Sequence, residues 1–191
     1  MRRISIFYYF TITFVIVLID QISKSLIVKN LREGDTVSVI GNFLNFHFIY
    51  NQGGAMGTNV GPPWAYAILT AVALVLIVRY FIRSKLDDVF TKISLALILG
   101  GAIGNLLDRV RFGKVVDFID ADFPDIPVLH IYRWFTFNVA DAAITVGLIL
   151  FAISIIFKNP KKDEPADSLP ASGSDPDKPE REAITDNGQT P

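Results

Sequence analysis

Long apolar runs dominate the pattern of hydrophobic and polar positions along this chain. Four of them, at residues 4–23, 64–81, 93–107 and 137–157, carry few charges. A helix needs about 20 mostly apolar residues to cross a bilayer. The run at 93–107 is short for a span, so we expect it either to lengthen at its ends or to stop near one membrane face. The pattern predicts four transmembrane helices.

The first apolar run has an alternative interpretation. Arg2 and Arg3 precede it, and a basic start before an apolar stretch is also typical of a cleaved secretory signal peptide. The run ends in Asp20, Gln21 and Lys24 instead of a small-residue cleavage site, and further apolar runs follow it. We therefore favour a first membrane helix.

The stretch between the first two spans follows a different pattern. β-Branched and aromatic residues mix there with glycine and asparagine, which is typical of short strands and turns. They include Val37, Val39, Phe43, Phe46, Phe48 and Tyr50. Residues 51–57 are too rich in glycine for a stable helix, and Pro62 and Pro63 suit the first turn of the next one. We predict an all-α membrane protein with a small β element.

The C-terminal end differs in composition from the rest. Residues 160–191 hold six of the ten prolines and no aromatic residue. Such a segment buries too little surface to offset its chain entropy, so we expect a disordered tail after a membrane domain at 1–159. Lysines and arginines flank the span ends on the side of the two termini, which by the positive-inside rule places both termini in the cytoplasm.

With this topology, polar side chains collect at the outer ends of all four spans. Ionisable residues at membrane depth are costly and are rare unless they have a role. By helical spacing, two helix faces are polar: Gly101, Asn105 and Asp108 on the third span, and Asn138, Asp141 and Thr145 on the fourth. Some of these residues, taken one at a time, also have a purely structural interpretation. Asp20 and Lys24 suit an i,i+4 ion pair, and Asp141 suits a helix N-terminus.

The composition limits the chemistry of such a site. There is no cysteine, and His47 and His130 form no H-E-x-x-H pair, so thiol nucleophiles and a helical metalloprotease site are excluded. Ser23 and Lys24 point apart on a helix, which disfavours a serine–lysine dyad. A formal net charge of -1 argues against a nucleic-acid partner.

A pair of carboxylates remains as the candidate chemistry. Two neighbouring carboxylates share one proton, and the ionised member can act as a base on water without a metal or cofactor. Several carboxylates lie near the right level, and the pattern alone does not choose among them: Asp20, Asp108, Asp117, Asp120 and Asp141.

Five sequence blocks, in order, match a known family: DQISK (20–24), NQGGAM (51–56), GNLLDR (104–109), VVDFID (115–120) and FNVADAAI (137–144). Over residues 7–157 the chain resembles the bacterial lipoprotein signal peptidases, also called signal peptidase II. The resemblance implies that Asp117 and Asp141 are the catalytic dyad. It implies substrate-binding or supporting roles for Asp20, Lys24, Asn51, Gly53, Gly101, Asn105, Asp108, Arg109 and Asn138.

The resemblance also implies an activity. Members of the family are aspartic endopeptidases of the bacterial inner membrane that use no metal or other cofactor. They cleave prolipoproteins just before a cysteine that carries a diacylglyceryl group, and globomycin-type antibiotics occupy their site. The implied partners are lipidated prolipoproteins and membrane lipids. The implied fold is four transmembrane helices plus a small extracytoplasmic β-sheet, with the active site at that face.

Two features depart from the family pattern. Met56 stands where phenylalanine is common, and the segment 121–134 lengthens the interval between the two aspartates into what we expect to be an altered lid. We also expect a mobile piece of chain to bring Asp117 to the site. Two alternatives stay open: a small transporter or proton channel, which would favour charges near the midplane or repeated halves, and a non-enzymatic assembly protein.

Overall fold

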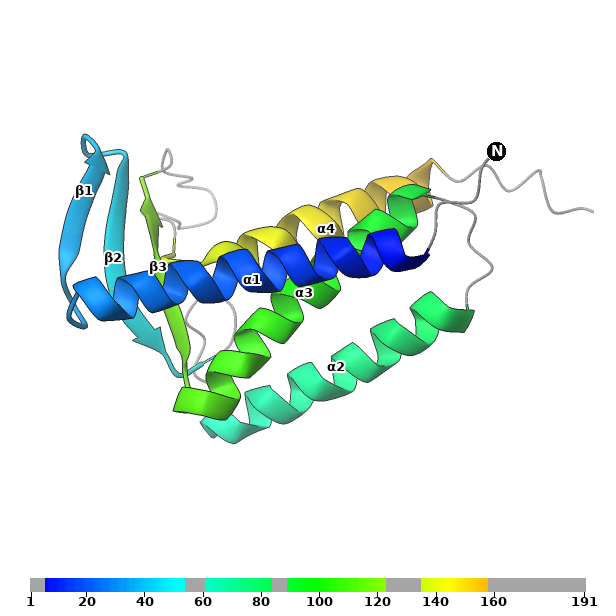
Figure 1. The fold of residues 1–191 in the computed structure, drawn as a ribbon, viewed down its shortest axis with the longest axis horizontal. Helices are drawn as coiled ribbons and strands as arrows, with labels where there is room; N and C mark the ends of the chain where they lie inside the picture. Colours follow the sequence, from blue (N-terminus) through cyan, green and yellow to red (C-terminus); the bar gives the residue numbers. More distant parts are fainter. Residues whose placement is uncertain (1–5, 54–60, 84–88, 123–134, 158–191) are drawn as a thin grey trace, which may run out of the picture. The chain divides into compact units, whose positions relative to one another are not determined.

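A computed structural model describes residues 6–53, 61–83, 89–122 and 135–157 of the chain. In order, its elements are α1 (Ile6–Asn30), β1 (Thr36–Ile40), β2 (Leu44–Asn51), α2 (Pro63–Arg83), α3 (Val89–Phe112), β3 (Val115–Ala121) and α4 (Val139–Ile156). Within these ranges, four helices are long and apolar enough to cross a membrane, which confirms the predicted fold class (Figure 1). The predicted tail at 160–191, Met56, His130 and residues 123–134 lie outside the described ranges.

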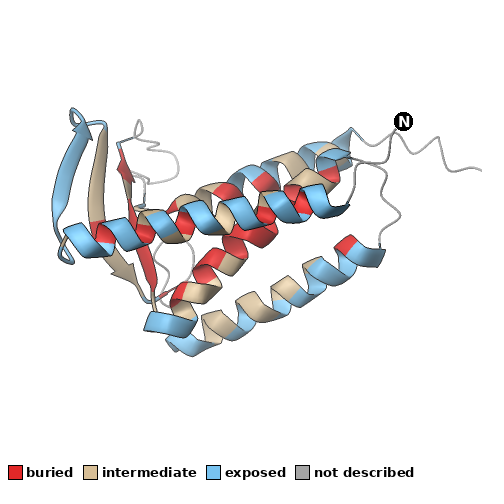
Figure 2. Ribbon diagram, in the orientation of Figure 1, coloured by how far each residue is buried: buried red, intermediate tan, exposed pale blue. Residues whose placement is uncertain are grey.

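α3 is the central helix of the bundle. It contacts α1, α2 and α4, and 61% of its most apolar stretch is buried, against 6% for α2 (Figure 2). The short run expected at 93–107 lengthens at both ends, to Val89 and Phe112. The added turns hold polar side chains that other elements cover: Thr91 donates to Ser154 on α4 at 3.0 Å, and Asp108 is buried at the opposite end. Extension, and not an early stop, is therefore how this helix reaches a bilayer's thickness.

Glycines let the other helices approach α3 closely. A Cβ atom at Gly100 would lie 2.8 Å from Cβ of Ile16 on α1, and one at Gly104 would lie 2.5 Å from Oδ2 of Asp20. A Cβ at Gly101 would collide with the carbonyl oxygen of Ala140 on α4. Gly100 and Gly104 have the G-x-x-x-G spacing that lets helices approach closely, and α1 and α4 both pack on this glycine-rich face.

The three strands form one antiparallel sheet in the order β1-β2-β3. The sheet lies at the end of the helices where α1 and α3 finish and where α2 and α4 begin (Figure 1). The strands expected between residues 37 and 50 are confirmed as β1 and β2, which pair with Thr36 opposite His47. β1 is exposed throughout, whereas β3 is mostly buried.

β3 is the element that the sequence did not predict. α3 ends at Phe112, Gly113 turns the chain with a φ of 69°, and β3 starts at Val115. Val116 and Phe118 then pack with Ile27 and Phe48 in a small core beneath the sheet. Asp117 therefore lies on a buried, paired strand, and the expectation that a mobile piece of chain carries it is wrong.

Candidate active site

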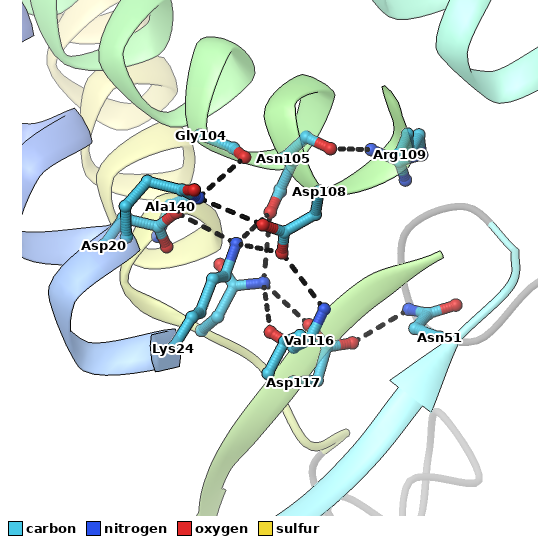
Figure 3. Close-up of polar contacts among 12 residues, drawn as sticks. Asp20, Lys24, Asn51, Gly104, Asn105, Asp108, Arg109, Val116, Asp117 and Ala140 are labelled. Carbon is cyan, nitrogen blue, oxygen red and sulfur yellow. Dashed lines mark hydrogen bonds and ion pairs between the residues drawn. The ribbon is translucent and has the colours of Figure 1, made fainter. Parts of the chain in front are cut away.

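Asp117 lies near the middle of β3, with only 1% of its surface exposed. Two asparagine side chains hold its two carboxylate oxygens. Asn138 donates to Oδ1 at 2.7 Å. Asn51, at the end of β2, donates to Oδ2 at 2.9 Å (Figure 3). The sheet register brings these residues together, since Asn51 pairs with Val115 two positions before Asp117. The carboxylate is thus fixed from both sides.

Asp141 occupies the third position of α4, where a carboxylate is favoured by the partial positive charge of a helix N-terminus. Asn138 is the N-cap of this helix. It accepts from the backbone N–H of Asp141 at 2.9 Å, and its own N–H donates to Oδ2 of Asp141 at 3.3 Å. This reciprocal capping box orients the Asp141 side chain from the helix start. The plainer interpretation of Asp141 as a helix-end carboxylate therefore holds alongside any chemical role.

Two asparagines connect the aspartates to each other. Asn105 on α3 donates to Oδ1 of Asp141 at 2.7 Å, and its own Oδ1 accepts from the Asn138 amide at 3.1 Å. The same Asn138 amide nitrogen donates to Asp117. A continuous row of hydrogen bonds therefore runs from Asp117 through Asn138 and Asn105 to Asp141. Asn105, Asn138 and Asp141 converge as the two polar helix faces predicted, and Asp117 joins them from β3.

A buried ion cluster lies behind this row. The ammonium group of Lys24 is 2.9 Å from Oδ2 of Asp20 and 2.9 Å from Oδ2 of Asp108. It also donates to Oδ1 of Asn105 at 2.9 Å. The i,i+4 pair considered for Asp20 and Lys24 is present, but it is part of this larger cluster. All three charged residues are at most 3% exposed, so they support the site from inside and do not line its surface.

The remaining predicted residues have structural contacts around the site. Arg109 donates to the carbonyl oxygen of Gly53 at 3.2 Å, which joins α3 to the end of the segment after β2. Gly101 lies against Ala140 and allows α4 to reach Asn105. Both are placed to shape the site, and Gly101 is buried.

Gln21 is a supporting residue that the sequence pattern does not predict. Gln21 donates to Oδ1 of Asp108 at 3.0 Å and to the carbonyl oxygen of Gly104 at 3.2 Å, and it accepts from Arg111 at 2.7 Å. A neutral side chain beside Asp20 carries no strong signal in the sequence. Its place inside the DQISK block could have drawn attention to it.

Several other candidates lie apart from the site. Ser23 donates to the backbone oxygen of Asp20, and Thr145 donates to that of Asp141, so each bonds within its own helix. His47 pairs with Thr36 in the exposed part of the sheet. Asp120 follows Asp117 by three positions on β3, and an odd spacing places the two on opposite faces of a strand. Of the candidate carboxylates, Asp117 and Asp141 are the two that the asparagine row joins.

Burial raises the pKa of Asp117 from 3.8 to about 7, and the negative charge of Asp141 adds to the rise. Hydrogen bonds from Asn51 and Asn138 and the charge of Lys24 act in the opposite direction. A carboxyl group with such a pKa exchanges its proton near neutral pH, as a general acid or base must. Among the described residues, no three His, Asp or Glu side chains converge in a way that could hold a metal ion.

Comparison with known proteins identifies the family. Residues 12–157 match the family model described as signal peptidase (SPase) II. The chain is 36% identical to a lipoprotein signal peptidase of Syntrophus aciditrophicus (strain SB), over 77% of this chain and 91% of that protein. It is 40% identical to one of Syntrophotalea carbinolica, over 70% and 81%.

Solved structures agree with the sequence matches. A bacterial membrane enzyme determined by the in meso method at 2.3 Å resolution superposes with a TM-score of 0.74 at 33% identity, covering 85% of this chain and 96% of that one. A second, determined at 1.9 Å, gives 0.69 at 33% identity, covering 82% and 97%. With four apolar helices and a match across most of its length, this chain belongs to the signal peptidase II family.

Proposed function

We propose that this protein is a lipoprotein signal peptidase that cleaves by an aspartate dyad, Asp117 and Asp141. The main support for this proposal is the continuous row of asparagine hydrogen bonds that joins Asp117 on β3 to Asp141 on α4. The negative charge of Asp141 raises the pKa of Asp117, so the two carboxyl groups interact electrostatically. A pair of this kind holds one proton between its members, which is the state that acid–base hydrolysis requires.

The chemical step follows from this shared proton. The ionised aspartate takes a proton from a water molecule, and the resulting hydroxide attacks the carbonyl carbon of the scissile peptide bond. The protonated aspartate donates to the carbonyl oxygen as negative charge develops there. The tetrahedral intermediate then collapses, the C–N bond breaks, and the leaving nitrogen receives a proton from the dyad. Water supplies every atom that is added, and no cofactor takes part.

The substrate proposed is a prolipoprotein whose cysteine carries a diacylglyceryl group, cleaved just before that cysteine. The matched relatives named as lipoprotein signal peptidases support this choice. So does the position of the site at one end of four apolar helices, where a lipid-anchored substrate and water can meet (Figure 1). We place the protein in the bacterial inner membrane with both termini cytoplasmic and the site at the outer face. Membrane lipids and globomycin-type inhibitors would be its other ligands.

Cleavage of two matched substrates tests this function. One is a diacylglyceryl-modified prolipoprotein, and the other is the same chain with its lipid-bearing cysteine replaced by serine. Purified protein in EDTA should release the signal peptide from the first alone, and mass spectrometry should place the new N-terminus at the lipidated cysteine. Cleavage of the serine substrate at a similar rate, or cleavage that stops in EDTA, would refute the proposal. A transporter or an assembly protein would cleave neither substrate.

A further inference from the structure

We infer that Lys24 is a positioning residue that fixes both dyad aspartates relative to each other. This inference rests on the proposed function, because it assigns to Lys24 a role in aligning that dyad. The ammonium group has three N–H bonds, and three oxygens lie 2.9 Å away: those of Asp20, Asp108 and Asn105. Each of these three partners leads to one of the segments that carry the aspartates (Figure 3).

The first arm reaches the start of α4. Asp20 accepts from the Lys24 ammonium at Oδ2 and from the backbone N–H of Ala140 at Oδ1, each at 2.9 Å. Ala140 immediately precedes Asp141 and is fully buried. Because the N–H groups of a first helical turn have no partner inside the helix, this bond anchors the turn that presents Asp141.

The second arm reaches β3. Oδ2 of Asp108 accepts both from the Lys24 ammonium, at 2.9 Å, and from the backbone N–H of Val116, at 3.1 Å. Val116 immediately precedes Asp117 and is 1% exposed. One ammonium group is therefore linked, through one carboxylate on each side, to the residue before each dyad aspartate.

The third arm sets the orientation of an amide. Asn105 can present either its oxygen or its nitrogen to Asp141, and these two choices have opposite effects on a carboxylate. Lys24 donates to the Asn105 oxygen, and this leaves the Asn105 nitrogen facing Asp141. The Asn138 amide donates to the same oxygen at 3.1 Å, so Lys24 and Asn138 together hold the Asn105 amide in this orientation.

These contacts exclude simpler roles for Lys24. Its three hydrogens are occupied, it is 3% exposed, and the cluster gives it two carboxylate partners, so it neither reaches substrate nor serves as a base. The charges that act on Asp117 include those of Asp141 on α4 and Lys24 on α1, and Arg109 on α3 also interacts with it. The positive charge of Lys24 lowers the pKa of Asp117, so Lys24 also acts electrostatically on the dyad.

The test compares Lys24→Met, which keeps the length of the side chain but not its charge, with Lys24→Arg. Lys29→Met is the matched control, because Lys29 is exposed in the last turn of the same helix. We expect Lys24→Met to lower kcat about 100-fold, the scale of a misplaced catalytic group, with KM changed less than about twofold. Its pH–rate profile should move to higher pH, because the charge that lowers the pKa of Asp117 is gone. Arginine should restore part of kcat.

A double variant separates positioning from charge balance. Lys24→Met leaves two buried carboxylates without their cation, which destabilises the fold. Lys24→Met combined with Asp108→Asn removes one of those charges and should recover thermal stability, while kcat stays low because the arms are broken. Recovery of kcat together with stability would overturn the inference, as would a Lys24→Met enzyme with wild-type kcat and an unmoved pH profile. If Asp117→Asn stays active, the proposed dyad itself fails, and that outcome is separate from any result at Lys24.

Discussion

Asn138 donates a hydrogen bond of 2.7 Å to Oδ1 of Asp117, a residue that lies 21 positions earlier in the chain. The same Asn138 caps the helix that carries Asp141 and exchanges two hydrogen bonds with that residue. One buried side chain thus connects a strand, a helix start and both aspartates. The orientation of the Asn138 side chain is tightly constrained, because its amide nitrogen also donates to Asn105 and to the carbonyl oxygen of Val116.

Two substitutions at Asn138 should separate its roles. Asn138→Ala removes the N-cap, which costs about 1 kcal/mol, and leaves buried acceptors unpaired, at about 1–3 kcal/mol. Asn138→Ser keeps a capping oxygen but cannot reach Asp117 and Asn105 together. We expect both variants to lose most of their turnover, and the serine variant to retain more thermal stability than the alanine variant. Thermal unfolding in detergent and prolipoprotein cleavage provide the two measurements.

The close packing of α3 against α4 should depend on Gly101. Alanine normally favours a helix over glycine by about 1 kcal/mol, but here its Cβ would collide with the carbonyl oxygen of Ala140. Overpacking of this kind costs about 1–3 kcal/mol, so Gly101→Ala should lower the unfolding temperature and reduce cleavage by shifting the start of α4. Val110→Ala, at a 75% exposed position of the same helix, is the control. A Gly101→Ala protein as stable as the wild type would contradict the packing described for this helix pair.

The raised pKa of Asp117 should appear in the pH dependence of stability. In the unfolded chain this carboxyl titrates near 3.8, whereas in the folded protein its pKa is about 7. The folded state therefore holds the proton more tightly. The free energy of unfolding should fall as pH rises from 3.8 towards 7, and this contribution should be constant above that range. Each pKa unit is worth about 1.4 kcal/mol, so the loss is on the order of 4 kcal/mol.

Asp117→Asn should remove this pH dependence. Its unfolding temperature should vary less between acid and mildly alkaline pH than that of the wild type, although one of the two asparagine hydrogen bonds to the carboxylate would be lost. Asp122→Asn changes an exposed carboxylate close by and should follow the wild-type curve. Equal pH dependence in all three proteins would show that folding leaves the pKa of Asp117 unchanged, and this would contradict the raised pKa.

Much of the fold could be predicted from the sequence because membrane helices leave a strong signal. The four apolar runs located α1, α2, α3 and α4, and the break in periodicity before Asn51 located β1 and β2. The ends were less accurate, since α1 continues to Asn30 and α3 to Phe112. These added turns contain lysine, asparagine and arginine, and apolar composition alone cannot show that neighbouring elements bury part of a polar turn.

The site was only partly predictable for a different reason. Helical spacing correctly grouped Asn105 with Asp108 and Asn138 with Asp141, because both pairs lie on single helices. Asp117 lies on β3, whose partner is β2, more than sixty positions away in sequence. A strand of seven residues within a charged segment leaves little periodic signal, so the family motif, and not the pattern, singled out this aspartate. Contacts between elements, such as those that Lys24 on α1 makes with α3, depend on tertiary packing, which cannot be predicted from the local sequence pattern.

The most direct test of the dyad is single-turnover cleavage of a diacylglyceryl-modified prolipoprotein by purified Asp117→Asn and Asp141→Asn, with EDTA present and with substrate binding measured alongside. Asparagine matches the shape of aspartate but cannot take or give the proton. Each variant should bind substrate and insert like the wild type while cleaving it about 100- to 10,000-fold more slowly, the range that acid–base groups contribute. Cleavage by either variant at close to the wild-type rate would contradict the account.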